Sequence, residues 1–233
     1  MAFRYYYADK IREQFPGFKG TDEELQDAID DISLLYNSAL KVLETRLGIL
    51  SDHFDKKHSY MPIHTVQSRL KTFESIMEKA GRYDIEDPIN NLDTVRREIL
   101  DIGGLRVICN YEEDIHTMAD LLLEQEDIEM IKIKDYCDKP KESGYRSLHL
   151  VTAVPVFLVG KKKIVPVEIQ FRSIMMDAWA SLEHELRYKN KGELTQDIVD
   201  TLKECAEELH RVDEKMSRVR HEVLKDDSKY SDY

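Results

Sequence analysis

The stretch IVPVEIQFR, residues 164–172, alternates between apolar side chains and side chains that carry functional groups. Its odd-numbered positions hold the apolar residues Val165, Val167, Ile169 and Phe171, and its even-numbered positions from 168 onward hold Glu168, Gln170 and Arg172. Successive side chains of a strand point to opposite faces of the sheet. The stretch therefore predicts a strand with one core face and one polar face.

Four more segments predict strands, at 66–72, 105–109, 128–133 and 145–156. In the last of these, Tyr145, Ser147 and His149 share one face. Arg69 and Lys71 share a face of the first strand, while Arg106 lies between apolar neighbours in the second. A sheet with one solvated face produces the same pattern. Tyr, His, Gln and Glu side chains, however, suit the recognition of a planar polar ligand.

Helical periodicity separates these strands. A capping box at Thr21 and Glu24 opens a long amphipathic helix that ends near residue 57. Further helices are expected at 72–82, 92–100, 113–125, 173–189 and 195–225. We expect an α/β (α+β) fold with a mixed five-stranded sheet flanked by helices. The predicted segments are an N-terminal helical segment (1–58), a core (59–190), and a C-terminal helix and tail (191–233).

Charge is divided unevenly along the 233 residues, whose formal net charge is 34 − 46 = −12. The total argues against broad coating of nucleic acid. Residues 132–172, however, hold nine bases against four acids, and residues 64–82 hold four bases against two acids. We expect these two blocks to form one local cationic cleft. A solvated face is the plain alternative for each block.

The remaining composition points to a reducing compartment. The three cysteines, Cys109, Cys137 and Cys205, are far apart and form no CxxC pair. This argues against a disulfide framework and favours the cytoplasm. No apolar run approaches the roughly 18 residues of a membrane span, so no membrane partner is expected.

Two sets of side chains are candidates for chemistry. Lys71, Ser75 and Lys79 recur every four residues at the start of a predicted helix, which suits a phosphate site, although a solvated lysine face is the alternative. Asp101 and Glu168 lie at or in strands beside basic residues. Such a pair is suited to hold Mg²⁺ against a polyphosphate, or else to form salt bridges. No Walker loop, GxGxxG or HExxH motif is present.

Several motifs together resemble those of the RelA/SpoT family, in particular its small, synthetase-only alarmone synthetases. They are DIGGLRVIC from Asp101, DYCDKPKESGYRSLHL from Asp135, and VEIQFRSIMMDAWASLEHELRYK from Val167. Arg69-Leu70-Lys71, Glu74-Ser75-Ile76 and Lys79 precede them, so the resemblance spans about residues 60–189. It implies a nucleotidyltransferase-like sheet and a pyrophosphokinase. Such an enzyme transfers the β,γ-diphosphate of ATP to the ribose 3′-hydroxyl of GDP or GTP.

The resemblance also implies roles for individual residues. Arg69 and Arg106 would enclose adenine, and Lys71, Ser75 and Lys79 would bind the phosphates of ATP. Asp101 would bind Mg²⁺, and Glu168 would activate the acceptor hydroxyl and join the metal site. The acceptor contacts would be Tyr145, stacked on guanine, together with Lys134, Lys141, His149 and Gln170.

Oligomeric state and regulation are further expectations. The resemblance implies a homotetramer, and an alarmone or single-stranded RNA is a candidate regulator. Two alternative functions stay open at this point. One is a catalytically silent RNA-binding regulatory module, and the other is a pyrophosphokinase that acts on tRNA or an adenine nucleotide.

Overall fold

The computed structural model describes residues 17–189 and 194–227 of the chain. Helix α2 (Asp22–His58) begins at the predicted capping box, in which Thr21 and Glu24 each accept a hydrogen bond from the backbone N–H of the other. One face of α2 is buried along its length, at Leu25, Ile29, Ile32, Tyr36, Ala39, Leu40, Leu43 and Leu47. The spacing of three and four residues predicted from the sequence is therefore confirmed.

Five strands form one mixed sheet in the order β1-β2-β5-β4-β3. The strands are β1 (Ile63–Leu70), β2 (Gly103–Cys109), β3 (Glu129–Asp135), β4 (Leu148–Leu158) and β5 (Lys161–Ser173). Strands β2 and β5 are parallel, and the other three pairs are antiparallel. The predicted fold class is thus confirmed. The central strand, β5, contains the alternating stretch that first predicted a sheet.

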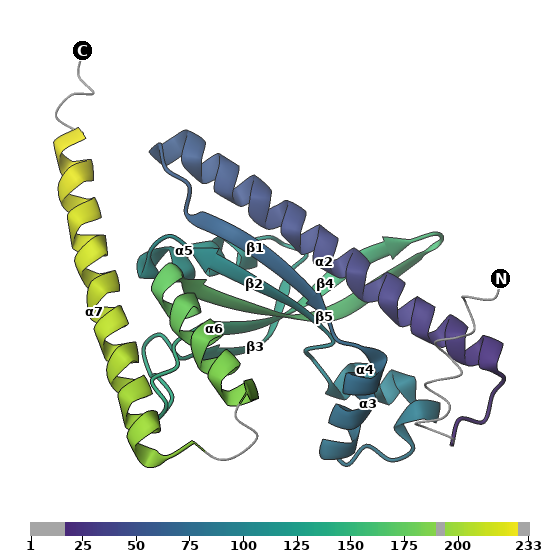
Figure 1. Ribbon diagram of the computed structural model, residues 1–233. Coiled ribbons are helices and arrows are strands. Elements are labelled where there is room, and N and C mark those ends of the chain that lie inside the picture. The colour runs from purple at the N-terminus through teal and green to yellow at the C-terminus, as the bar shows by residue number, and fades with distance from the viewer. Residues whose placement is uncertain (1–16, 190–193, 228–233) are drawn as a thin grey trace.

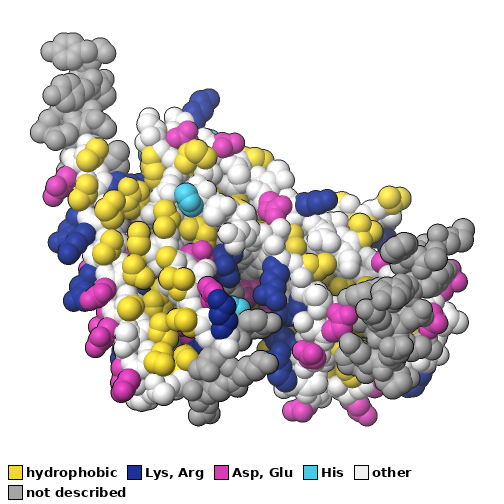
Figure 2. All heavy atoms as spheres, viewed as in Figure 1, with side chains coloured by type: hydrophobic (Ala, Val, Ile, Leu, Met, Phe, Trp, Pro, Cys, Tyr) yellow, Lys and Arg dark blue, Asp and Glu magenta, His cyan; other side chains and the backbone are white. Residues whose placement is uncertain are grey.

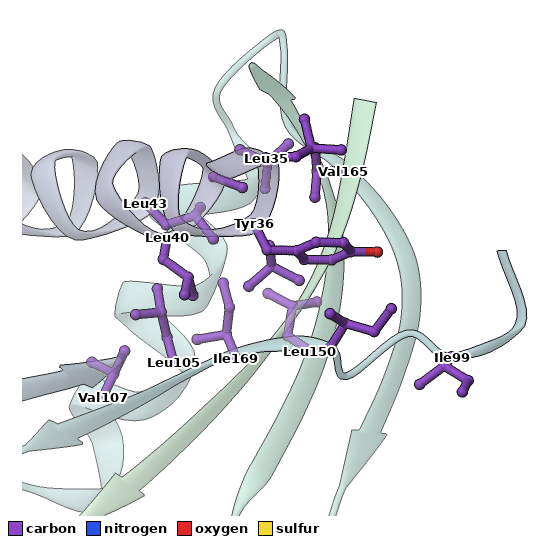
Figure 3. Close-up of a cluster of buried hydrophobic side chains, with 14 of the residues drawn as sticks. Leu35, Tyr36, Leu40, Leu43, Ile99, Leu105, Val107, Leu150, Val165 and Ile169 are labelled. Carbon is purple, nitrogen blue, oxygen red and sulfur yellow. The ribbon is translucent and has the colours of Figure 1, made fainter. Parts of the chain in front are cut away.

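Helices α2 and α5 (Glu112–Leu123) cover the apolar face of the sheet. Figure 3 shows Leu40 and Leu43 of α2 above Leu105 of β2 and Ile169 of β5. Val165, Val167, Ile169 and Phe171 of β5 are 0–1% exposed, whereas the polar residues Glu168 and Gln170 between them are half-buried. The alternation in the sequence therefore separates the two faces as predicted.

The other described helices lie around the remainder of the sheet. They are α3 (Phe73–Arg82), the short 3₁₀ helix η1 (Pro88–Asn90), α4 (Leu92–Glu98), α6 (Ile174–Lys189) and α7 (Gln196–Asp227). Figure 1 shows α3 and α4 at one end of the sheet, with α6 and α7 packed together on the other side.

Several predicted strand boundaries differ from the structure, and two of them bear on the polar face. Strand β1 ends at Leu70 because Thr72 caps α3, and β4 begins at Leu148 instead of residue 145. Ser147, just before β4, is fully buried, and its hydroxyl donates to the backbone oxygen of Phe171. The N–H of Tyr136 donates to the carbonyl of Ser147, which continues the β3–β4 pairing by one hydrogen bond past the ends of the two strands.

The division into segments 1–58, 59–190 and 191–233 stays a prediction. The first and third segments extend outside the described residues, as does most of the predicted break at 189–194. Within the described ranges, none of the helices is long and apolar enough to cross a membrane.

Candidate active site

A cavity of about 440 Å³ opens on the polar face, where β1, β2 and β5 lie side by side. Its lining comprises Gln67, Ser68, Arg69, Lys71, Asp101, Gly104, Leu105, Arg106, Glu168 and Gln170. Figure 2 shows a hollow in this part of the surface with Lys and Arg side chains on both sides of it. A concave site with a few convergent charged groups is the usual form of a ligand pocket.

The register of the three strands explains the shape of this cavity. Gly104 pairs with Arg69 on one side and with Glu168 on the other, so the three residues form one row across the sheet. Gly104 has no side chain, and the floor between the guanidinium and the carboxylate therefore stays open. In the next row, Arg106 pairs with Gln170. The two arginines thus lie on adjacent strands at the same cavity.

Asp101 binds two lysines at the edge of the cavity. Its Oδ2 lies 2.6 Å from Lys79 Nζ and 3.4 Å from Lys71 Nζ. Lys71 is held at the end of β1 by a hydrogen bond from its backbone N–H to the carbonyl of Ile102. The other carboxylate oxygen, Asp101 Oδ1, is buried and has no hydrogen-bond partner in the described part of the chain. This oxygen is available to an additional ligand.

Glu168 is held as a carboxylate. Burial acts to raise its pKa, but the hydrogen bond and charge of His149, the hydrogen bond of Gln170 and the charge of Lys79 outweigh burial, and the pKa lies below its ordinary value. Gln170 Nε2 donates to Glu168 Oε2 at 3.0 Å, and His149 Nδ1 lies 3.4 Å from Glu168 Oε1. One carboxylate oxygen is thereby oriented by a residue of the same strand, and the other by a residue of the neighbouring strand β4.

Tyr145 closes the site beside His149. Its hydroxyl lies 2.8 Å from His149 Nε2 and accepts a hydrogen bond of 2.9 Å from Arg172 Nη2. The ammonium of Lys141 lies 4.7 Å from the ring centroids of both Tyr136 and Tyr145. An aromatic ring with a cation against it provides a stacking platform beside positive charge, which suits a base that carries phosphates.

The predicted site residues fall into two groups. Arg69, Lys71, Asp101, Arg106, Glu168 and Gln170 line the cavity itself, and Tyr145, His149, Lys141 and Lys79 join it through direct contacts. Ser75 and Lys134 do not line it. The Ser75 hydroxyl accepts a hydrogen bond from Thr72 Oγ1 in the first turn of α3. Lys134 is exposed on β3, in register with His149.

Two residues of the site were given no role from the sequence. Arg172 was placed on the polar face by the alternation of β5, and its guanidinium contacts Tyr145 and Gln170. Asp177 lies in the first turn of α6, and its Oδ1 is 2.9 Å from Arg172 Nη1 and 3.4 Å from Arg106 Nη1. The only sequence signal for this pair was an acid five residues after a strand arginine.

The carboxylates Asp101 and Glu168 fit a magnesium site that is completed by a substrate. Within the described ranges, no three His, Cys, Asp or Glu side chains gather closely enough to hold a metal ion by themselves. Mg²⁺ usually binds one or two carboxylates and takes its other oxygen ligands from water and phosphates. Asp101 Oδ1, which has no hydrogen-bond partner among the described residues, is an oxygen ligand of the required kind.

Known proteins match most of the chain. Residues 68–193 match the family described as the region found in RelA / SpoT proteins. GTP pyrophosphokinase YwaC of Bacillus subtilis (strain 168) is 41% identical over 190 residues, which cover 82% of this chain and 89% of that protein. GTP pyrophosphokinase YjbM of the same organism is 35% identical over 196 residues, which cover 84% and 90%. The crystal structure of small alarmone synthetase 1 from Bacillus subtilis bound to its product pppGpp has a TM-score of 0.71 and 36% identity, and covers 81% of this chain and 94% of that one.

Proposed function

This chain belongs to the RelA/SpoT family, and from that premise we propose that it is a GTP pyrophosphokinase that makes alarmones. It transfers the β,γ-diphosphate of ATP to the ribose 3′-hydroxyl of GDP or GTP. The products are AMP and ppGpp or pppGpp. The observation that carries this proposal is that one and the same cavity is lined by the arginine pair Arg69 and Arg106 and by the carboxylates Asp101 and Glu168.

The donor nucleotide occupies the β1–β2 side of the cavity in this proposal. Arg69 and Arg106 enclose the adenine ring, because planar guanidinium groups stack on aromatic faces. Burial and the neighbouring charge of Arg172 lower the pKa of Arg106, although the group stays protonated at neutral pH. The concentration of positive charge favours an anionic ligand. Lys71 just before α3, Ser75 in its first turn and Lys79 in its last turn are assigned to the phosphates of ATP.

Mg²⁺ is the proposed cofactor, held by Asp101 and Glu168. When bound, it neutralises charge on the phosphate oxygens of ATP. Lys71 and Lys79 both contact Asp101 Oδ2, which leaves Oδ1 as the oxygen that would bind the metal.

The acceptor nucleotide occupies the β4 side of the cavity. Tyr145 stacks on guanine, while Lys134, Lys141, His149 and Gln170 contact the phosphates and ribose. The 3′-oxygen of the acceptor attacks the β-phosphorus of ATP, the bond from that phosphorus to the α,β-bridging oxygen breaks, and AMP leaves. The hydroxyl proton passes to Glu168, whose lowered pKa keeps it ionised and ready to accept at neutral pH.

The remaining proposals concern assembly and compartment. Exposed apolar residues lie along α6 and α7, at Leu182, Leu186, Ile198, Val212, Met216, Val219 and Val223. Figure 2 shows this hydrophobic surface on the left of the molecule, and it supports a homotetramer. The sequence offers five apolar positions of the last helix for such an interface, with packing inside the chain as the alternative: Ile198, Leu202, Cys205, Leu209 and Val212. Of these, Leu202 and Leu209 pack on Trp179 and Ala206 within the chain.

All three cysteines are free, which supports a cytoplasmic location. An alarmone or single-stranded RNA remains the proposed regulator.

One assay tests the proposed function against its alternatives. The purified protein is incubated with ATP and Mg²⁺ and with GDP, GTP, an adenine nucleotide or deacylated tRNA, and the nucleotide products are resolved by anion-exchange chromatography. We expect AMP and a guanosine 3′-diphosphate product from GDP or GTP. Product only with tRNA or the adenine nucleotide would instead identify another acceptor. RNA binding without any AMP release would identify a silent module. The Glu168→Gln variant, which should bind ATP but not turn over, controls for contaminating enzymes.

A further inference from the structure

Arg172 is almost fully buried at the centre of the acceptor side, with a side chain that is 6% exposed. Its Nη2 donates to two acceptors, Tyr145 Oη at 2.9 Å and Gln170 Oε1 at 3.0 Å. Its Nη1 donates to Asp177 Oδ1 at 2.9 Å, which supplies the opposite charge that burial of a guanidinium requires. The guanidinium thus contacts three groups that come from three different parts of the chain.

Two chains of polar contacts lead from Arg172 to Glu168. One passes through Gln170, whose Nε2 lies 3.0 Å from Glu168 Oε2. The other passes through Tyr145 and then His149, whose Nδ1 lies 3.4 Å from Glu168 Oε1. Together the two chains form a closed ring of five side chains, with Arg172 and Glu168 on opposite sides of it.

The chemistry of the end groups sets the direction of both chains. Arginine has only donors and an ionised carboxylate has only acceptors. Gln170 must therefore present its carbonyl oxygen to Arg172 and its amide N–H group to Glu168. Tyr145 must accept from Arg172, which leaves its own hydrogen for His149 Nε2 when the imidazole is neutral. The ring hydrogen of His149 then lies on Nδ1, which faces Glu168.

We propose that Arg172 is a positioning residue that orients both chains, so that each ends in a donor aimed at Glu168; this inference rests on the proposed function of Glu168 as the group that takes the acceptor proton. Without the guanidinium, the amide of Gln170 and the hydroxyl of Tyr145 can reverse. A reversed amide would present an oxygen to the Glu168 carboxylate and repel it. Arg172 acts on the reaction through these neighbours and does not touch the reacting atoms.

The tautomer of His149 gives a test that does not depend on activity. The chain has 8 histidines, and their ring nitrogens can be observed by long-range ¹H–¹⁵N correlation in ¹⁵N-histidine-labelled protein. The His149 signals are assigned by their loss in His149→Gln. The spectrum is recorded at about pH 8.5, where an ordinary histidine is neutral. We expect the hydrogen on Nδ1 in the native protein and a mixture of tautomers in Arg172→Gln. A native His149 with its hydrogen on Nε2 would overturn the proposal.

Kinetics give the second readout. Arg172→Lys keeps the charge, but it donates from a single atom and is unsuited to the span between Tyr145, Gln170 and Asp177. We expect kcat to fall about 10²-fold, as for a misplaced catalytic group, with the KM for ATP changed less than about threefold. The matched control is Arg146→Lys, because Arg146 is half-buried and donates to the single carbonyl of Cys137. This control should stay within about twofold of the native kcat.

The outcomes separate this inference from the function itself. Native protein without alarmone product refutes the proposed function, while the His149 tautomer still decides the orientation of the network. If the native protein is active, the positioning role is refuted by an unchanged His149 tautomer in Arg172→Gln together with an unchanged kcat in Arg172→Lys. Tyr145→Phe removes one chain without altering Arg172, so it replaces the arginine variants if they fail to fold. It should likewise release the His149 tautomer, and an unaltered tautomer would count against the proposal.

Discussion

Lys79 and Asp101 are 22 residues apart in the sequence, and their side chains form a 2.6 Å hydrogen bond at the edge of the cavity. The bond joins the last turn of α3 to the turn before β2. Lys71 reaches the same carboxylate oxygen at 3.4 Å. The two lysines therefore orient the carboxylate of the proposed metal ligand.

Asp101→Asn should reduce kcat/KM by at least about 10²-fold, because the substitution removes a charge placed to stabilise the metal–phosphate complex. Activity measured against Mg²⁺ concentration checks this, and the variant should need more Mg²⁺ for half-maximal rate. Asp93→Asn is the control, since Asp93 is 84% exposed and pairs only with Arg96 among the described residues. An unchanged Mg²⁺ requirement in Asp101→Asn would remove Asp101 from the metal site.

Arg69→Lys and Arg106→Lys should each raise the KM for ATP by about tenfold and leave the KM for the acceptor within about twofold. Lysine keeps the charge but loses the planar group that stacks on adenine, a contact worth about 1–2 kcal/mol when shielded from water. Initial rates at varied ATP and fixed GTP measure this. If the acceptor KM rises as much as the ATP KM, the adenine assignment is wrong.

Tyr145 offers two substitutions that separate its ring from its hydroxyl. Tyr145→Ala removes the stacking surface, and should raise the acceptor KM much more than the ATP KM. Tyr145→Phe keeps the ring but loses the bonds to His149 and Arg172, so it should lower kcat with a smaller change in acceptor KM. Equal effects of Tyr145→Ala on both KM values would argue against guanine stacking.

The pH dependence of the rate should report the environment of Glu168. Its lowered pKa keeps the carboxylate ionised to a lower pH than an ordinary Glu, so the acid limb of kcat/KM that this group causes should lie at a lower pH than an ordinary Glu would give. His149→Ala removes a hydrogen bond and a charge that lower this pKa, while burial continues to raise it. The acid limb should therefore move to higher pH. A limb that stays in place would show that His149 does not tune Glu168.

Gly144 anchors the loop that carries Tyr145 against α7. Its φ is +89°, and a Cβ at this position would lie 2.6 Å from the Cβ of Ala206. Gly144→Ala should cost about 1–3 kcal/mol of stability from backbone strain, with added displacement of the loop from the clash. Thermal unfolding and the acceptor KM measure the two effects. Combining it with Ala206→Gly should restore part of the acceptor KM but not the strain, which separates loop displacement from general destabilisation.

Much of the fold was predictable because its signals are local. The capping box at Thr21, the cap at Thr72 and the alternation in β5 depend only on residues within a few positions of one another. The surroundings of Ser147 were not predictable for the opposite reason. Its alternation with Tyr145 and His149 predicted a place on the ligand-facing side, but the residue is fully buried and its hydroxyl donates to the backbone oxygen of Phe171, 24 residues later. Short-range pattern cannot report such a contact.

The sequence by itself determined which side chains face the core and which face the ligand, because the direction of a side chain along a strand is a local property with a period of two. It also determined the family, through motifs that keep their order and spacing. Only the tertiary structure decided which polar groups meet. Gly104 separates Arg69 from Glu168, and His149 of β4 lies beside Glu168 of β5, because strand order and register place them so. Order and register follow from packing between distant segments, and side-chain alternation within one strand contains no information about them.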